Sequence, residues 1–370
     1  MQYMQIKHGL DFSQPWLLCL DEIQYNKHIG KILHEIFHTP TPTKRTSKKA
    51  LVRPPVRIKI IATGISHGGY QEFLGLRPKD YSVLPIYTIS YLEYLQRKGF
   101  HTDYLTPGRL SPILAQEMQP LLQEFLNRWA YPHVILAQTE EKKKEAIAHI
   151  MHEIYQLDVS FWFDRFDVGY FKPIINIIND QFGQVYNKHQ LKLQHNIPLR
   201  IVDTYLTFLE DNYLIASIEH RYTDKKREVS LKKKAMLLDM GIKNYLHGHF
   251  SRKLYDYRSM LYMVIQELYK TLPLDAKIYT YKKINGSEID IIVEYNDILY
   301  PIVIGERDSP SLPKVFEWFM KQYGKQVGRL IKTTPWSASI RDYDTGSHVQ
   351  FQTIPYFLIS MWASKIEAWH

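Results

Sequence analysis

A short apolar run that ends in two adjacent carboxylates places the strongest constraint on the fold. Trp16 to Leu20 read WLLCL, which has the length and composition of a strand buried on both faces, as in a parallel sheet. Asp21 and Glu22 follow directly, and ligands of open α/β sheets gather at the carboxyl ends of the strands. We therefore expect a parallel sheet with Asp21 and Glu22 at its edge. In the alternative interpretation the two carboxylates only begin a helix, where acidic residues are common.

A second strand with a polar end is predicted over residues 57–66, which read RIKIIATGIS. Thr63 and Ser66 follow its apolar part and would lie near the two carboxylates, because ligand sites form where neighbouring strands end. A carboxylate can hold Mg²⁺ through its water shell, and a second one can orient a water molecule toward a γ-phosphate. The two strands together favour a nucleotide site more than either strand alone.

Length and composition indicate a protein of several domains without membrane spans. The 370 residues suffice for two or three domains, and 45% hydrophobic with 23% charged residues is typical of globular proteins. No apolar run approaches the roughly 18 residues of a membrane span, and the N-terminal residues lack a secretion signal. The single cysteine, Cys19, lies in the first predicted strand and is expected to be buried. We expect a cytoplasmic protein, and its net charge of +9 favours an anionic partner such as DNA.

The middle of the chain is predicted to be helical, with a DNA-binding arrangement at its end. Apolar residues recur at helical spacing between residues 112 and 180. From 181 to 220 the pattern is helix, turn, helix and wing strand, with Ile201 and Tyr205 facing inward on the second helix. Candidate DNA contacts are Lys188, Arg200 and Thr204. Many winged-helix units dock proteins instead, and that alternative stays open.

The last 110 residues have α/β character. A helix is predicted from Tyr257 to Leu272, and three strands follow between residues 278 and 306. Turns are expected at Asn285-Gly286 and at Asn296-Asp297.

The motifs, taken in order, resemble prokaryotic AAA+-like P-loop ATPases that carry a winged helix and a C-terminal domain of the PD-(D/E)XK restriction-endonuclease-like fold. The resemblance extends over nearly the full chain. It rests on LCLDEIQ, ATGIS at 62–66, LRPK at 76–79, SYLEYL at 90–95, YLTFLEDNYLI at 205–215, KAMLLDMGIKNYLHG at 234–248 and GSEIDIIVE at 286–294.

The resemblance implies a mixed α/β fold in four parts. These are an ATPase core with a truncated P-loop parallel sheet (1–110), a helical lid (111–180), a winged helix (181–245) and a nuclease-like α/β domain (246–370). It also implies ATP and Mg²⁺ as cofactors. Their implied contacts are Asp21 for Mg²⁺, Glu22 for the attacking water, Thr63 and Ser66 for the phosphate, and Arg77 as sensor or finger.

Two departures from the family pattern decide the expected function. The sequence contains no G-x-x-x-x-G-K-[ST] phosphate loop, and we expect the ATPase core to be N-terminally truncated. In the nuclease-like part, Asp290 matches the central Asp of the family pattern, and Glu288 lies beside it. The implied Glu-x-Lys falls on apolar residues at Val303 to Gly305, and the implied first-helix acid falls near Leu261.

We therefore expect an interaction or DNA-binding module without independent ATPase or nuclease activity. In the alternative, the phosphate loop is supplied upstream or by a partner chain, and an ATPase is formed. A partner chain or a homo-oligomer is expected, because an incomplete first sheet would leave an apolar face exposed and cause self-association. The histidine pairs His34/His38 and His247/His249 have no third ligand at metal-binding spacing, so structural or surface roles are favoured.

Overall fold

The fold is described from a computed structural model. It describes residues 15–26, 28–38, 58–64, 81–101, 112–128, 131–163, 168–181, 183–184, 188–222, 232–250, 257–282, 288–304, 314–323, 330–334, 343–344 and 349–353. The chain divides into two compact units. The N-terminal unit comprises residues 1–85 and 207–212, and the C-terminal unit comprises residues 86–206 and 213–370.

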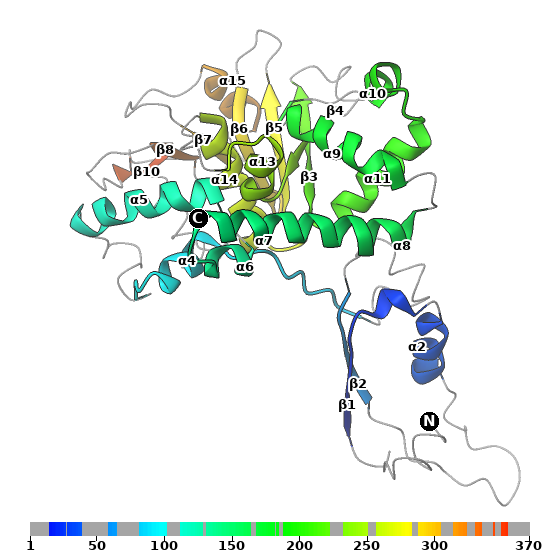
Figure 1. Ribbon diagram of the computed structural model, residues 1–370. Helices are drawn as coiled ribbons and strands as arrows, with labels where there is room; N and C mark the ends of the chain where they lie inside the picture. Colours follow the sequence, from blue (N-terminus) through cyan, green and yellow to red (C-terminus); the bar gives the residue numbers. More distant parts are fainter. Residues whose placement is uncertain are drawn as a thin grey trace, which may run out of the picture. The chain divides into compact units, whose positions relative to one another are not determined.

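The sheet of the N-terminal unit contains the two predicted strands, and they are parallel (Figure 1). Strands β1 (Trp16–Leu20) and β2 (Ile58–Ala62) pair in register from one end to the other. The 3-10 helix η1 (Ile23–Tyr25) and helix α2 (Ile29–His38) follow β1. One face of the sheet packs on these helices because apolar residues of both alternate toward it. That small core contains Ile23, Ile29 and Leu33, with Leu20, Ile60 and Tyr81 packed against it.

The other face of this sheet is exposed, so the prediction that β1 is buried on both faces is wrong. Leu17 is 56% exposed and Ile61 50% exposed, and Cys19, expected to be buried, is exposed as well. Cys19 pairs with Ile61 across the two strands, which places these side chains on one face. Within the described ranges the sheet has two strands only, and its buried side chains cluster on the α2 face alone.

Helices form the first part of the C-terminal unit, as the apolar spacing predicted. Ser90 caps α4, because its side chain accepts from the Glu93 N–H and its own N–H donates to the Glu93 carboxylate. Leu122 and Phe125 lie among the apolar residues at helical spacing and are buried, whereas Leu157 is 54% exposed. The elements are α4 (Tyr91–Arg97), α5 (Pro112–Arg128), α6 (Pro132–Leu136), α7 (Glu140–Glu153), the π-helix η4 (Ile154–Val159), α8 (Ser160–Trp162), η5 (Val168–Tyr170) and α9 (Phe171–Asp180).

The order helix, turn, helix and strand after residue 181 is also observed. Helix α10 (Lys188–His195) is followed by α11 (Leu199–Asp211), and then by β3 (Ile215–Tyr222) and β4 (Lys232–Leu237). Ile201 and Tyr205 of α11 are buried, as the helical spacing predicted. The Tyr205 ring stacks on Phe163 with ring centroids 4.0 Å apart, which fixes α11 against the preceding helices.

In its described residues, the C-terminal unit is built on an eight-stranded mixed sheet in the order β4-β3-β5-β6-β7-β8-β10-β9. The predicted turn at Asn296-Asp297 is confirmed, because both residues have positive φ (50° and 61°), as a two-residue hairpin requires. The turn predicted at Asn285-Gly286 lies outside the described residues. The remaining elements are α13 (Met240–Leu246), α14 (Tyr257–Thr271), β5 (Lys277–Lys282), β6 (Glu288–Tyr295), β7 (Ile298–Ile304), α15 (Val315–Tyr323), β8 (Leu330–Thr334), β9 (Tyr343–Asp344) and β10 (Val349–Thr353).

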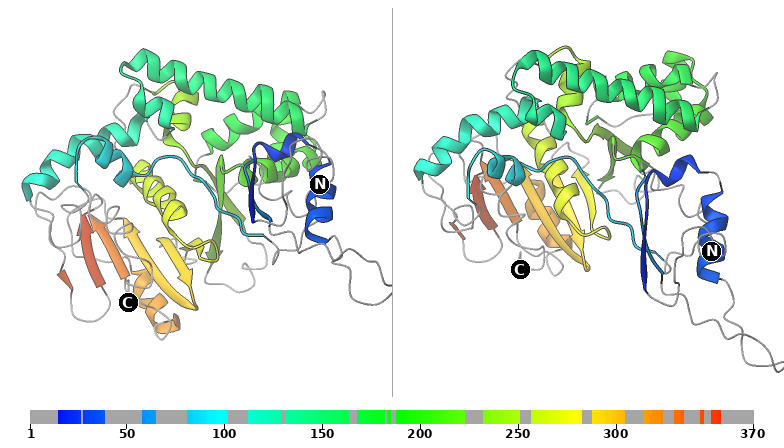
Figure 2. Two further views of the ribbon diagram at one scale, coloured as in Figure 1. Left: turned by 90° about the horizontal axis from the view of Figure 1, so that it is seen from below. Right: turned by 60° about the horizontal axis from the view of Figure 1, so that its bottom comes forward.

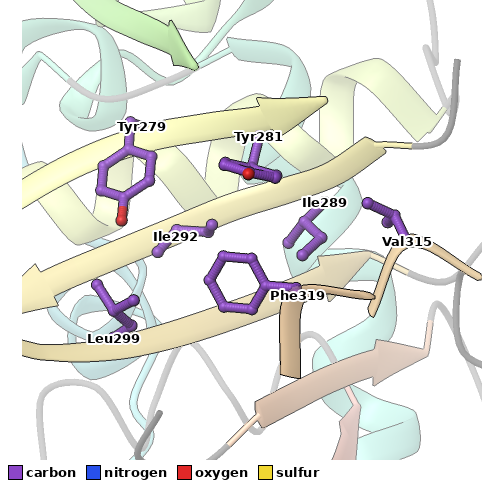
Figure 3. Close-up of a cluster of buried hydrophobic side chains, with 7 residues drawn as sticks. All are labelled: Tyr279, Tyr281, Ile289, Ile292, Leu299, Val315 and Phe319. Atoms are coloured by element: carbon purple, nitrogen blue, oxygen red, sulfur yellow. The ribbon is translucent and has the colours of Figure 1, made fainter. Parts of the chain in front are cut away.

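Two helices pack on opposite faces of the central strands (Figure 2). Helix α15 covers one face, where Phe319 (1% exposed) and Val315 meet apolar side chains of β5, β6 and β7 (Figure 3). Helix α14 lies on the other face and reaches β6 through the hydroxyl of Tyr257, which donates to Asp290. The central strands are therefore buried on both sides, which explains why β7 is almost entirely apolar.

The first segment of the N-terminal unit ends at residue 85, and the division into four domains stays a prediction. Strand β3 pairs in parallel with β5, so the two strands belong to one sheet although they are far apart in the chain. That pairing joins residues about sixty positions apart, which no local pattern could indicate. None of the described helices is long and apolar enough to cross a membrane.

Candidate functional site

The N-terminal unit brings together three of the predicted nucleotide-site residues. The Thr63 hydroxyl donates to the Asp21 carboxylate, and the Glu22 N–H donates to the Thr63 hydroxyl oxygen at 3.1 Å. Two backbone hydrogen bonds, from Thr63 N–H to Leu20 C=O at 2.8 Å and from Ile23 N–H to Thr63 C=O at 3.0 Å, extend the strand pairing to this point. Asp21, Glu22 and Thr63 therefore lie together at the ends of the two strands.

Glu22 has an unusual backbone conformation at this site. Its φ of 48° is left-handed, a region that costs a residue with a side chain about 1 kcal/mol or more. The side-chain amide of buried Gln24 donates to the Glu22 carboxylate and holds it in place. Asp21 and Glu22 are exposed, so both carboxylates are accessible to a ligand from solvent. The other two predicted contacts, Ser66 and Arg77, lie outside the described residues.

The second candidate site centres on Asp290 of β6. Strand β5 advances from Tyr279 to Tyr281 while β6 advances from Ile292 to Ile289, so β6 carries one extra residue, a β-bulge, beside Asp290. The Tyr257 hydroxyl donates to one carboxylate oxygen of Asp290, and the Ile304 N–H donates to the other at 2.8 Å. Both oxygens of Asp290 are therefore engaged within the protein.

The surroundings of Asp290 change its ionisation. Burial is the largest effect and raises the pKa of the Asp290 carboxyl to about 6. The hydrogen bonds from Tyr257 and Ile304 favour the carboxylate and oppose this rise, whereas the nearby negative charge of Glu288 adds to it. Asp290 is thus a carboxyl group that changes its charge near neutral pH.

A set of charged and polar groups continues from Asp290 along the same end of the sheet. The Lys234 ammonium donates to the Glu288 carboxylate at 2.6 Å, and the Lys282 ammonium lies 4.0 Å from its other oxygen. The Nδ1 atom of buried His220 lies 4.0 Å from Glu288 and forms a hydrogen bond with the Thr280 hydroxyl. These side chains come from β4, β5, β6 and β3, which are neighbours in the sheet.

Most of the residues that the nuclease-like resemblance implied lie in the described part of the chain. Glu288 and Asp290 both lie on β6, as predicted, and Val303 and Ile304 of β7 are buried apolar residues. The residue of α14 that reaches Asp290 is Tyr257 and not Leu261. Gly305 and Glu306 lie outside the described residues.

Sequence reasoning missed Tyr257, Lys234 and His220. Their contacts join residues 33, 54 and 60 positions apart, and no spacing rule relates strands or helices at such separations. A useful signal was present nonetheless. His220 lies in the predicted wing strand, and a histidine in a strand is expensive to bury unless it is paired.

The predicted DNA contacts lie together on α10 and α11. Lys188 forms an ion pair with Asp203, and the Thr204 hydroxyl donates to the Arg200 carbonyl at 2.8 Å. Lys188, Arg200 and Thr204 are all exposed, as predicted. The outward surface of α11 is therefore polar, with acidic Asp203 among its members.

The histidine pairs give no metal centre in the described part of the chain. His247 contacts Asp180 at 3.2 Å, and its ring lies 5.9 Å from that of His249. The side chains of His34 and His38 lie outside the described residues. Among the described side chains, no group of three or more histidine, cysteine, aspartate or glutamate residues could hold a metal ion.

In comparison with known proteins, the model of a domain of unknown function (DUF8612) matches residues 119–253. The matched segment contains most of α5, the helices up to α13 and strands β3 and β4, so it includes Arg200, His220 and Lys234. It does not include Asp21 or Asp290. No curated protein and no solved structure matches the chain.

Proposed function

We propose that the chain is a relative of AAA+-like P-loop ATPases that acts in the cytoplasm as a DNA-binding module, with a nuclease-like sheet that binds without cleaving. One observation carries this proposal. Both oxygens of Asp290 accept hydrogen bonds from within the protein, from Tyr257 and from the Ile304 N–H. A metal-dependent nuclease needs such a carboxylate to bind its metal ion. The apolar residues of β7 supply no second ligand beside it.

The charge of the chain and the exposed surface of α10 and α11 support DNA as the partner. The net charge is +9, and Lys188 and Arg200 lie on neighbouring helices. Lys188 is paired with Asp203, but exposed ion pairs contribute only about 0–1 kcal/mol, so a DNA phosphate can replace the aspartate. Arginine suits phosphate because its planar guanidinium can donate two parallel hydrogen bonds.

Fluorescence anisotropy with a labelled duplex tests the role of α11. Arg200→Ala should weaken binding by about three- to tenfold, the usual effect of losing one phosphate contact. Lys144→Ala is the matched control, because Lys144 is an exposed lysine of α7 and its loss changes the net charge equally. Equal affinities of the two variants would exclude α11 as the DNA contact.

Incubation of supercoiled plasmid with the protein and Mg²⁺ or Mn²⁺ tests whether the protein cleaves DNA. After the protein is removed, the plasmid should still be supercoiled. Nicking that is lost in Asp290→Asn would show that the sheet is a nuclease and would overturn the proposal.

A second candidate function is ATP hydrolysis with a phosphate loop from another polypeptide segment. The contact of Asp21 with Thr63 at the ends of two parallel strands favours it, because a hydroxyl beside an exposed carboxylate suits a hydrated Mg²⁺ and a phosphate. Asp21 would hold Mg²⁺ through water, and Glu22 would orient the attacking water. Bound Mg·ATP would supply the phosphoryl group and neutralise its charge.

Phosphate release from ATP tests this second function. If it is correct, a complex that contains the chain and a G-x-x-x-x-G-K-[ST] segment hydrolyses ATP, and Glu22→Gln abolishes the activity. Glu117→Gln, on exposed Glu117 of α5, is the control and should leave the rate unchanged. Hydrolysis that persists in Glu22→Gln would exclude the assigned role of Glu22.

A further inference from the structure

Two lysines and a histidine surround one carboxylate at one end of the C-terminal sheet. Lys234 lies 2.6 Å from Glu288, and Lys282 and His220 each lie 4.0 Å from it. We call Lys234, Lys282, His220 and Glu288 the sheet-end cluster. Two lysine ammonium groups face the Glu288 carboxylate. The second carboxyl group at this end of the sheet, Asp290, has both oxygens engaged by Tyr257 and the Ile304 N–H.

The cluster lies where strands β3 and β5 end. These strands are parallel and pair His220 with Thr280, while β5 pairs Lys282 with Glu288 of β6. The four strands β4, β3, β5 and β6 are consecutive in the sheet and lie side by side (Figure 1). The carboxyl ends of parallel strands are the usual position of ligands in α/β sheets.

The burial of the cluster suits an anion that arrives from solvent. The exposed fraction of the side chain rises from 3% at His220 to 17% at Lys234, 29% at Glu288 and 38% at Lys282. The cluster therefore opens toward solvent at Lys282. Lys234 is mostly shielded from water, so its attraction for an anion is less weakened than that of a surface lysine.

We propose that the sheet-end cluster binds a phosphodiester group of nucleic acid, with Lys234 and Lys282 as its ligands. Glu288 is the internal counter-ion that holds the two ammonium groups in place until the phosphate displaces it. His220 is a positioning residue, because its bond to Thr280 fixes it beside Glu288 at the base of the cluster. This inference rests on the proposed DNA binding and adds a contact on the sheet that is separate from α10 and α11.

Variants that remove a charge should change the affinity for duplex in opposite directions at the lysines and at Glu288. With a labelled duplex of about 20 base pairs in about 100 mM KCl, Lys234→Gln and Lys282→Gln should each weaken binding roughly three- to tenfold. Glu288→Gln should tighten binding by a similar factor, because it removes the competing carboxylate. Lys144→Gln, which changes an exposed lysine of α7, should bind as the wild type does.

The tighter binding of Glu288→Gln is the decisive result, since a misfolded variant would not gain affinity. Far-ultraviolet circular dichroism of each lysine variant shows whether weaker binding arises only because the variant is misfolded. Unchanged binding in Lys234→Gln, or weaker binding in Glu288→Gln, would overturn the proposal.

Calorimetric titration with inorganic pyrophosphate separates this site from the proposed function. If the wild type binds pyrophosphate but no duplex, and Lys234→Gln binds no pyrophosphate, the anion site is retained and DNA is rejected as the partner. If Lys234→Gln binds duplex as tightly as the wild type does, the proposed function is retained and the site is rejected. Failure of the wild type to bind either probe would reject both.

Discussion

The bulge beside Asp290 decides what this residue can do. It places Ile289 and Ile292 on one face of the sheet, in the cluster with Phe319, although they are three positions apart. Asp290 therefore faces α14, where Tyr257 reaches it. A carboxyl group in this position is costly to ionise, which is consistent with its pKa of about 6.

Asp290→Asn should remove a pH dependence of stability. A carboxyl group whose pKa is raised in the folded state binds more protons there, so ionisation lowers the free energy of unfolding as the pH rises from about 4 through 6. Above that range the asparagine variant should be more stable than the wild type, by up to about 3 kcal/mol. Below about pH 4 the difference should vanish. Urea denaturation at several pH values checks this, and a wild type that gains stability over the same interval relative to the variant would contradict it.

Single residues could be predicted where local rules place them. Asp21 and Thr63 follow apolar strands, and the ends of neighbouring parallel strands meet, so their contact could be inferred. The partners of Asp290 and Glu288 could not, because Tyr257 and Lys234 are brought to them by tertiary packing alone.

At the level of elements, a buried ion pair joins helix α14 to the start of α4. Glu267 is fully buried and accepts from the Tyr91 N–H at 3.0 Å and from the Lys270 ammonium at 2.9 Å. Lys270 also donates to the carbonyl of Ile89 at 2.9 Å. The pair thus satisfies polar backbone groups on both sides of the α4 cap at Ser90.

Glu267→Ala should destabilise the protein strongly, because it leaves Lys270 buried without its carboxylate. Breaking such a pair by removing one partner costs about 3–5 kcal/mol. Glu294→Ala is the matched control, since Glu294 pairs at 3.5 Å with Lys277, which is 65% exposed. Its loss should cost less than about 1 kcal/mol. Thermal unfolding of both variants checks this, and similar losses would contradict the assignment.

Helices and strands were predicted well where the spacing of apolar residues within the element indicates its type. Helices α11 and α14 and strands β5 to β7 all lie close to their expected ranges. The assignment of β3 to a separate wing could not reveal its parallel pairing with β5, because the apolar pattern of a strand does not indicate which strand lies beside it.

For the whole molecule, the exposed apolar face of the β1–β2 sheet is the main surface expected to cause self-association. Leu17 and Ile61 are about half exposed on a face that carries Cys19 as well. Parallel sheets are normally covered on both faces. We predict that the chain self-associates through this face at high concentration.

Leu17→Lys combined with Ile61→Lys should reduce this association by adding charge to the apolar face. Leu274→Lys is the control, because Leu274 is 63% exposed in the C-terminal unit. Sedimentation velocity over a range of concentrations checks the prediction. A wild type that stays monomeric throughout would contradict it.

The central claim is that this chain binds DNA through phosphate contacts. The salt dependence of duplex binding tests this claim most directly. Three to four contacts predict that the logarithm of the affinity falls with the logarithm of the salt concentration at a slope of roughly −3. Binding that does not change with salt, or that is absent at low salt, would contradict the claim.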